Sequence, residues 1–453
     1  MLYSASLPYT ADAAASYAAI ADLPWAIWLD SGGMGRYDIL CAQPVATLLT
    51  HGVNTEITDA TGVRHSADDP FDLLRLQLGE SAEAVPGIPF SGGALGYWGY
   101  DLVRRMAVLP VQAQDAEHLP DMAVGIYDWA IVLDHRQKTA RLVSQQRDPA
   151  TSQVLPKILA RLQSANTQPQ ESFTVNGRIG SNFTRATYQS AFDVVQNYLQ
   201  EGDCYQVNLA QRYAARASGD ALQAYLELRR LSPAPYSAFL DMPQARILCA
   251  SPECFLQVRA GKVETKPIKG TRPRMLDAQQ DAQQAQALQH SSKDRAENLM
   301  IVDLLRNDLG KSCVAGSVRV PKLFEVESYA QVHHLVSTVT GQLAEGQDAL
   351  TLLRNCFPGG SVTGAPKQRA MQIIEQLEPH RRGVYCGAIG YIGYDGNMDT
   401  NIAIRTLVYS GDEIRFWAGG GIVADSDAAA EYQETLDKAA GMLELLRRFG
   451  GST

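Results

Sequence analysis

Lys269 lies in the segment TKPIKGTRPR (265–274), between a proline and a glycine that restrict the backbone and close to several other cations. A lysine amine with a pKa near about 10.4 is almost entirely charged at neutral pH, so it is a nucleophile only where its surroundings lower that pKa. Neighbouring positive charges have this effect. The segment predicts an activated amine, although a solvated basic turn without a chemical role has the same composition.

Carboxylates recur at helical spacing in two later segments. Asp294 and Glu297 share one face of an expected helix, and Glu431, Glu434 and Lys438 form a stripe on a second one. Mg²⁺ is usually held by a few such carboxylates, because it requires oxygen ligands and keeps several waters. Each stripe taken alone also fits an ordinary solvated helix face.

Two glycine-rich segments and one arginine could bind an anion. The segment CFPGGSVTGAPK (356–367) places free N–H groups before an expected helix whose first turn suits Pro366, and it lacks the ending of a phosphate-binding P-loop. Gly419–Gly421 is expected to be a loop after a strand, where it either admits a ligand or only turns the chain. Arg405, in the expected strand NIAIRTL (401–407), needs a carboxylate from the protein or from a ligand.

The elements that must position these residues follow no regular βαβ period, which predicts an α+β class with antiparallel sheets. Helices are expected at 184–202, 222–231, 293–308, 349–356, 367–377 and 428–449. Strands are expected at 25–29, 46–49, 94–97, 122–133, 205–209, 237–241, 255–259, 262–267, 384–391, 398–409 and 413–418. A polar stretch predicts a linker at 161–182, between an N-terminal region (1–160) and a catalytic domain (183–453).

Composition narrows the class of protein. The 453 residues carry a net charge of −9 and contain no basic run, so a nucleic-acid partner is not expected. No apolar stretch approaches the roughly 18 residues of a membrane span, and the opening segment lacks the basic residues of a signal peptide. We expect a cytoplasmic protein with no membrane contact, a small-molecule ligand and seven reduced cysteines.

Taken together, seven motifs resemble the chorismate-utilising enzymes. They are SPE (251–253), PIKGTRPR (267–274), KDRAENLMIVDLLRND (293–308), GSVTGAPK (360–367), IAIRT (402–406), GGGIVADSD (419–427) and EYQETLDK (431–438). The resemblance covers most of residues 184–445 and is weaker over the first 150. It implies an anthranilate synthase component I-like fold, with large antiparallel β-sheets and outer helices.

Two positions indicate the branch of the family. Anthranilate synthases carry alanine where this chain has Lys269, and members that add water to chorismate carry a lysine base where it has Gln206. The resemblance therefore implies amination of chorismate at C4 by ammonia. The product would be 4-amino-4-deoxychorismate, for 4-aminobenzoate and folate biosynthesis.

The same resemblance implies roles for individual residues. Lys269 would attack C2 of the ring and form a covalent adduct, with Glu253 as general acid and base and His334 near the ring. The substrate would be bound by Arg405, Tyr385, Gly421, Thr363, Gly364 and Gln206. Mg²⁺ would be held by Glu297 and Glu434, with Glu431 acting through water. Where many relatives have a glutamate, this chain has the shorter Asp294.

The ammonia source and two alternatives remain open. None of the seven cysteines lies in the G-x-C-x-G context of a glutaminase nucleophile, so the resemblance implies a separate glutamine amidotransferase subunit. Amination at C2 with loss of pyruvate, as in anthranilate synthases, is one alternative, which Lys269 disfavours. A non-catalytic protein that binds chorismate or tryptophan is the other. The resemblance also leaves open a structural tryptophan bound near Tyr205 and Pro235, as in some relatives of this family.

Overall fold

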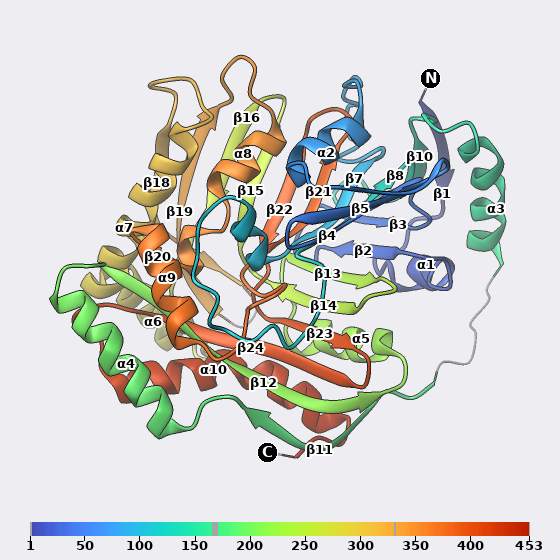
Figure 1. Ribbon diagram of the computed structural model, residues 1–453. Helices are drawn as coiled ribbons and strands as arrows, with labels where there is room; N and C mark the ends of the chain where they lie inside the picture. Colours follow the sequence, from blue (N-terminus) through green and yellow to red (C-terminus); the bar gives the residue numbers. More distant parts are fainter. Residues whose placement is uncertain (1, 165–170, 330–331, 453) are drawn as a thin grey trace.

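The computed structural model describes residues 2–164, 171–329 and 332–452, and its framework is two twelve-stranded sheets (Figure 1). In the first sheet the strands follow the order β1 (Tyr3–Leu7), β10 (Thr139–Ser144), β9 (Trp129–Asp134), β3 (Tyr37–Cys41), β2 (Ala26–Asp30), β13 (Tyr236–Asp241), β14 (Arg246–Ser251), β23 (Thr406–Ser410), β24 (Glu413–Ile422), β12 (Gln206–Ser218) and β11 (Thr174–Ser181), with β20 (Gly364–Ala365) on β12.

The second sheet contains the strand that carries Lys269 at one edge. Its order is β17 (Ile268–Pro273), β19 (Val332–Gln342), β16 (Lys262–Lys266), β15 (Cys254–Arg259), β22 (Met398–Ile402), β21 (Ala388–Gly393), β7 (Gly93–Trp98), β8 (Met122–Tyr127), β4 (Ala46–His51), β5 (Asn54–Asp59) and β6 (Gly62–Ser66), with β18 (Arg319–Ser328) on β19. The pairings in both sheets are antiparallel, as expected.

Helices lie outside the sheets (Figure 1). They are α1 (Ala14–Ala18), α2 (Pro70–Leu78), η1 (Tyr100–Arg105), α3 (Thr151–Gln163), α4 (Arg185–Gln200), α5 (Ala221–Leu231), α6 (Ala278–His290), α7 (Ser292–Gly310), α8 (Ala349–Cys356), η2 (Gly360–Val362), α9 (Lys367–Leu377) and α10 (Ala428–Arg448). The expected α+β class, with large antiparallel sheets and outer helices, is confirmed. Among the described residues, no helix has both the length and the apolar composition that crossing a bilayer requires.

Apolar side chains from the two sheets form a common core. Ile27 and Cys249 of the first sheet belong to the same buried cluster as Leu95 and Ile389 of the second. Separate clusters bury the outer faces of the sheets under the helices. The result is two stacked sheets covered by helices, which fixes the site-bearing strands β12, β15, β17 and β24 relative to one another.

Each sheet is built from both halves of the chain, with the N-terminal strands grouped at one end and the C-terminal strands at the other. β2 pairs with β13, and β7 pairs with β21, so the expected regions 1–160 and 183–453 share both sheets. Within the expected linker, Thr174–Ser181 forms β11 on β12, and residues 165–170 lie outside the described residues. The division into two regions stays a prediction.

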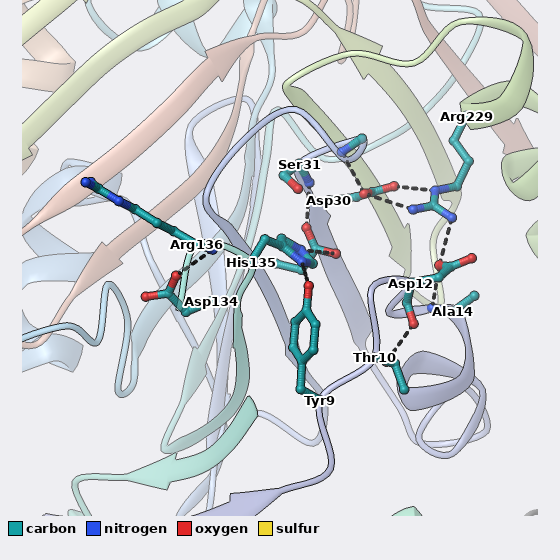
Figure 2. A network of polar contacts seen from close by, with 12 residues as sticks. Tyr9, Thr10, Asp12, Ala14, Asp30, Ser31, Asp134, His135, Arg136 and Arg229 are labelled. Atoms are coloured by element: carbon teal, nitrogen blue, oxygen red, sulfur yellow. Dashed lines mark hydrogen bonds and ion pairs between the residues drawn. The ribbon is translucent and has the colours of Figure 1, made fainter. Parts of the chain in front are cut away.

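A polar network ties the N-terminal strands to α5 (Figure 2). The buried carboxylate of Asp30, at the end of β2, accepts hydrogen bonds from Arg229 Nε at 2.7 Å and from the Tyr225 hydroxyl at 2.8 Å. His135 contacts Asp38 at 3.3 Å and the Tyr9 hydroxyl at 3.0 Å. Its hydrogen bond with Asp38 raises the pKa of His135. The contacts of Asp30 join segments 195 and 199 residues apart in sequence.

Three expected strands differ in detail. Residues 122–133 form two strands, β8 and β9, on either side of Asp128. The strand expected at 384–391 begins only at Ala388, and the one expected at 398–409 divides into β22 and β23. The bounds expected for α8 and α9 are confirmed, because their apolar periodicity is strong.

Candidate active site

Lys269 lies on an irregular part of β17. Ile268 is opposite Val336 and Thr271 is opposite His334, so β17 contains one residue more than β19 between these pairs. Gly270 supplies the positive φ of +82° that such a bulge needs. A bulge turns a side chain away from the regular alternation, and Lys269 Nζ donates a hydrogen bond to the main-chain oxygen of Ser361, at 3.2 Å, in η2. The segment is therefore an edge strand, not the solvated basic turn that was the alternative.

Burial lowers the pKa of Lys269, and the ammonium of Lys438 lowers it further. The negative charges of Glu297, Glu253 and Glu434 raise the pKa, but not enough to bring it back to the ordinary value of a lysine. The amine therefore faces charged groups from β14–β15, α7 and α10. An amine with a lowered pKa thus lies among carboxylates from three separate parts of the chain.

The cations next to Lys269 in sequence were expected to lower its pKa, and this attribution is wrong. Each of them is engaged with a carboxylate: Arg272 with Asp294 at 2.9 Å, Arg274 with Asp281, and Lys266 with Glu327. Paired charges largely cancel at a distance. The decisive cation comes instead from α10, 169 residues later in the sequence.

Glu253 lies between β14 and β15, with 5 % of its surface exposed. Burial raises the pKa of its carboxyl, while a hydrogen bond with the Ser361 side chain and the charge of Lys269 oppose this. A carboxyl with a raised pKa can hold and release a proton near neutral pH, which is the property of a general acid and base. Ser361 therefore contacts both Lys269 and Glu253, a role that the sequence did not indicate.

The carboxylates on α7 and α10 converge as the two stripes predict. Glu431 and Glu434 lie close to Gly420, which has no side chain. A Cβ added at Gly420 would be 3.2 Å from an oxygen of Glu431 and 3.3 Å from an oxygen of Glu434. Burial raises the pKa of Glu297, and the negative charges of Glu434 and Glu431 contribute. Burial also raises the pKa of Glu434. The ammonium of Lys438, 2.6 Å away, has the opposite effect, and the pKa of Glu434 is lowered overall.

These carboxylates suit a cation that keeps several of its water ligands, rather than one that protein ligands enclose completely. No group of three or more histidine, cysteine, aspartate or glutamate side chains within 2–164, 171–329 and 332–452 is arranged to hold a metal ion directly. The Oε2 atom of Glu431 is buried, however, and has no hydrogen-bond partner among the described residues. Lys293 Nζ lies 3.7 Å from Glu431 Oε1 and 4.0 Å from Glu297 Oε1. The site thus attracts positive charge with oxygen ligands, the donor type that Mg²⁺ requires.

Gly419–Gly421 does not form the expected loop, and this expectation is wrong. The three glycines continue β24 and pair with Ala210, Leu209 and Asn208 of β12. Their missing side chains leave room for neighbouring groups: an added Cβ at Gly421 would lie 2.7 Å from Gln206 Nε2. A run of glycines in a strand here marks close approach of side chains.

The side-chain amide of Gln206 is fully buried, and neither its oxygen nor its nitrogen has a hydrogen-bond partner in the described part of the chain. An unpaired buried amide is costly, so its retention indicates a polar ligand at this position. It lies at the start of β12, beside Gly421 and opposite Ala365 of β20.

Arg405 lies in a break between β22 and β23, so its expected placement in a continuous strand is wrong. Its φ of +50° interrupts the extended backbone, with the Arg405 carbonyl accepting from Ala250 N at 3.0 Å. Burial lowers the pKa of the guanidinium, and no carboxylate in residues 2–164, 171–329 and 332–452 pairs with it. The guanidinium of Arg405 is therefore available to the carboxylate of a ligand.

His334 is close to Arg405. Both residues line a small cavity of about 40 Å³ together with Tyr329 and Pro252. Burial and the charge of Arg405 lower the pKa of His334 to about 4, so its imidazole is neutral at pH 7. Its Nδ1 shares a hydrogen bond of 2.8 Å with the Thr271 hydroxyl, on the strand that carries Lys269.

Tyr385 and the Thr363–Gly364 pair flank this region. Tyr385 is buried and stacks on Trp417 of β24 with a ring separation of 6.0 Å. The Thr363 hydroxyl donates to Gly359 O at 3.1 Å, and the Thr363 carbonyl accepts from Asn208 N at 2.8 Å. The hydroxyl of Thr363 is therefore engaged within its own loop.

A separate cavity of about 350 Å³ lies between the two sheets, lined by residues that include Asp30, Ser31, Tyr37, Pro235 and Asp399. Pro235 is one of the two residues near which a tryptophan was considered. The other, Tyr205, is 70 % exposed and does not line the cavity. This cavity is distinct from the cluster around Lys269.

Comparison with known proteins is consistent with this geometry. Residues 26–444 match the family model described as chorismate binding enzyme. Aminodeoxychorismate synthase component 1 of Escherichia coli strain K12 is 50 % identical over 452 residues, covering 98 % of each chain. Anthranilate synthase component 1 of Streptomyces coelicolor is 38 % identical, covering 92 % of this chain and 82 % of that one.

A solved structure gives the same fold. The crystal structure of anthranilate synthase component I from Streptococcus pneumoniae superposes with a TM-score of 0.81 at 32 % identity, covering 90 % of this chain and 92 % of that one. The expected anthranilate synthase component I-like fold is confirmed. Because relatives with two different names share the fold, the activity depends on individual site residues.

Proposed function

Because the chain belongs to the chorismate binding enzyme family, we propose that it aminates chorismate at C4 with ammonia to give 4-amino-4-deoxychorismate. The observation that carries this proposal is the partly buried amine of Lys269, which has a lowered pKa and faces Glu253 and the carboxylates of α7 and α10. A protein that only binds chorismate has no use for an activated amine. The 50 % identical relative named for aminodeoxychorismate synthesis supports the same activity.

The first step uses Lys269 as the nucleophile. Its neutral amine forms a bond to C2 of the ring, the double bonds shift, and the bond from C4 to its hydroxyl breaks. Glu253 supplies a proton to the departing hydroxyl, which leaves as water. The result is an adduct between the lysine nitrogen and C2.

Ammonia completes the reaction in the second step. It adds at C4, the double bonds return, and the bond from C2 to Lys269 breaks. Glu253 accepts the proton that the new C4 nitrogen must lose, which restores the starting enzyme. Two displacements give retention at C4. The buried, unpaired amide of Gln206 is the group that we assign to the ammonia side of the site.

Chorismate is a dianion, and the charges of the site suit both of its carboxylates. The unpaired guanidinium of Arg405, together with Tyr385 and the main chain at Gly421, would bind the enolpyruvyl carboxylate. Neutral His334 lies beside Arg405 and would face the ring. The main chain at Thr363 and Gly364 would contact the ring carboxylate.

Magnesium is proposed as the cofactor, with Glu297 and Glu434 as ligands and Glu431 acting through water. The unpartnered oxygen of Glu431 and the mutual repulsion of the three carboxylates support a cation there. A bound magnesium ion would neutralise the ring carboxylate and assist departure of the hydroxyl.

A glutamine amidotransferase subunit is proposed as the source of ammonia. Relatives named as component 1 of a synthase support a partner component. The cysteines of this chain are all buried, and burial raises the pKa of several of them, Cys254 and Cys356 among them, which is the reverse of what a nucleophilic thiol needs. The expected cytoplasmic location belongs to the same proposal.

The decisive experiment incubates the protein with chorismate, Mg²⁺ and ammonium at high pH, then adds a 4-amino-4-deoxychorismate lyase. We expect 4-aminobenzoate only when the lyase is present. Anthranilate fluorescence without the lyase would establish amination at C2 instead, and chorismate left unconsumed would contradict both activities. Adding the amidotransferase subunit with glutamine in place of ammonium then tests the partner.

A further inference from the structure

A fully buried ion pair, Arg382 with Glu378, contacts two of the segments that carry the proposed substrate-binding residues. Arg382 follows α9, and its side chain is 1 % exposed; that of Glu378, which comes directly after the last residue of α9, is 3 % exposed. Arg382 donates to Glu378 from Nε at 2.9 Å and from Nη2 at 2.6 Å. Two charges removed from water in this way carry a large desolvation cost, and such pairs are often replaceable by apolar residues without loss of stability. Stability alone therefore does not account for the pair.

The remaining donors of Arg382 hold two segments of the site together. Nη1 donates to Val362 O at 2.8 Å, and Nη2 donates to Asn208 O at 2.9 Å. Val362 lies between Ser361, which contacts Lys269 and Glu253, and Thr363. Asn208 lies two residues after Gln206 on β12. One planar guanidinium thus joins the η2 loop to the strand that carries Gln206.

Glu378 and the rings around Arg382 extend this connection. Glu378 Oε1 accepts from Ala210 N at 2.9 Å, a second attachment to β12. The Arg382 guanidinium lies 4.8 Å from the ring centre of Tyr100 and 5.7 Å from that of Tyr385, a residue of the substrate site. Tyr385 N also donates to Arg382 O at 3.1 Å, so the chain turns directly from one residue to the other.

We propose that Arg382 and Glu378 are positioning residues that fix the η2 loop, β12 and Tyr385 in the arrangement that binds chorismate. Neither residue touches the substrate in this proposal. Their role is to hold three separate chain segments in register, which a rigid, bidentate ion pair does with more directional precision than apolar packing. The inference depends on the proposed function, since it concerns the binding of that substrate.

The test replaces the pair by apolar side chains of similar length, in the double variant Arg382→Met with Glu378→Met. We expect a melting temperature within a few degrees of the unmodified protein, because removing both charges leaves no unpaired ion. We also expect the KM for chorismate to rise at least tenfold, with a smaller change in kcat. A KM within twofold of the original value in a folded double variant would overturn the proposal.

A matched control uses another buried ion pair. Asp30 and Arg229 are also largely buried, at 0 % and 17 % side-chain exposure, but they join β2 to α5 and contact no residue of the proposed site. The double variant Asp30→Met with Arg229→Met should keep the KM for chorismate within twofold. An equal rise of KM in this variant would show that loss of any buried pair has the same effect and would overturn the specific role.

A second variant tests the same proposal if the double variant does not fold. Arg382→Lys retains a positive charge beside Glu378 but cannot donate to Val362 and Asn208 at once. We expect it to fold and to raise the KM for chorismate several-fold; an unchanged KM would count against the proposal. Failure of the unmodified protein to consume chorismate would instead contradict the proposed function.

Discussion

Lys269 and Glu253 meet at one residue: Ser361 accepts a hydrogen bond from Lys269 through its carbonyl oxygen, at 3.2 Å, and its side chain hydrogen-bonds with Glu253. The two groups are sixteen residues apart in sequence: Lys269 lies on β17 of the second sheet, and Glu253 lies on the connection from β14 of the first sheet to β15 of the second. Their meeting at η2 brings the proposed nucleophile and the proposed proton donor to one site. Both steps of the proposed reaction require this arrangement.

Replacing Lys269 by alanine should lower kcat/KM for 4-amination at least about a hundredfold, because the amine that forms the adduct is lost. Mass spectrometry of the unmodified protein exposed to chorismate without ammonia should show a peptide containing Lys269 that is heavier by chorismate less one water. Lys266→Ala is the matched control, since Lys266 pairs with Glu327 outside the cluster. An unmodified Lys269 peptide together with full activity of the alanine variant would exclude covalent catalysis.

The rate of adduct formation should rise with pH around a midpoint below 10.5, the ordinary pKa of a lysine, and fall again at the pH where Glu253 loses the proton that it supplies. Only the neutral amine reacts, and burial together with Lys438 lowers the pKa of Lys269, so the neutral form dominates at a lower pH than in solution. The rate should be measured without ammonia, so that the titration of ammonium does not contribute. His334, with a pKa of about 4, should add no step above pH 6.

Lys438→Gln tests the electrostatic origin of this shift. Removing a cation that lowers the pKa of Lys269 should move the midpoint of the adduct-rate profile to higher pH. Arg306→Gln removes a comparable charge on α7, where Arg306 pairs only with Asp303, and should leave the midpoint in place. A midpoint that does not move in Lys438→Gln would contradict the assignment.

Much of the site could be predicted from local motifs, because a motif fixes both residue type and spacing. The stripes of α7 and α10 bring Glu297, Glu431 and Glu434 together, since helical periodicity places residues on one face, and their role as metal ligands stays a prediction. Ser361 and Arg382 could not be found in this way. Their roles depend on η2 packing against β17 and β12, which are remote in sequence.

Two predictions of local structure were wrong for a common physical reason. The residues NIAIRTL alternate like a strand, yet the backbone breaks at Arg405, where φ is +50°. Gly419–Gly421 has the composition of a turn, yet it stays extended because β12 pairs with it. In both cases tertiary contacts override local preference, and both lie at the site.

The carboxylate cluster should bind a divalent cation, with opposite effects from two substitutions. Glu434→Gln should raise the Kd for Mn²⁺, followed by electron paramagnetic resonance, at least about tenfold, because a neutral amide is a weaker ligand for a hard cation. Lys293→Gln should lower the Kd about threefold or more, because its ammonium lies near Glu431 and Glu297 and competes for them.

Arg306→Gln is again the control for Lys293→Gln, since the two side chains lie on the same helix and are similarly exposed, at 52 % and 57 %. Equal changes of the Kd in both variants would show that the effect comes from the overall charge of the protein and not from the position of Lys293. A Kd that stays constant in Glu434→Gln would remove Glu434 from the proposed ligands. Neither readout depends on catalytic activity.

Gly270→Ala should impair catalysis more than it impairs folding. The φ of +82° at Gly270 is costly for alanine, by about 1–2 kcal/mol, and the new Cβ would lie 2.8 Å from the carboxylate of Asp294. Gly316→Ala, also at positive φ but with no neighbouring atom within 4 Å, measures the backbone cost alone. Because the bulge at Gly270 aims Lys269, we expect slower adduct formation only in Gly270→Ala. Its loss of stability should exceed that of Gly316→Ala, because Asp294 must also move. Equal adduct rates would show that the bulge does not position the amine.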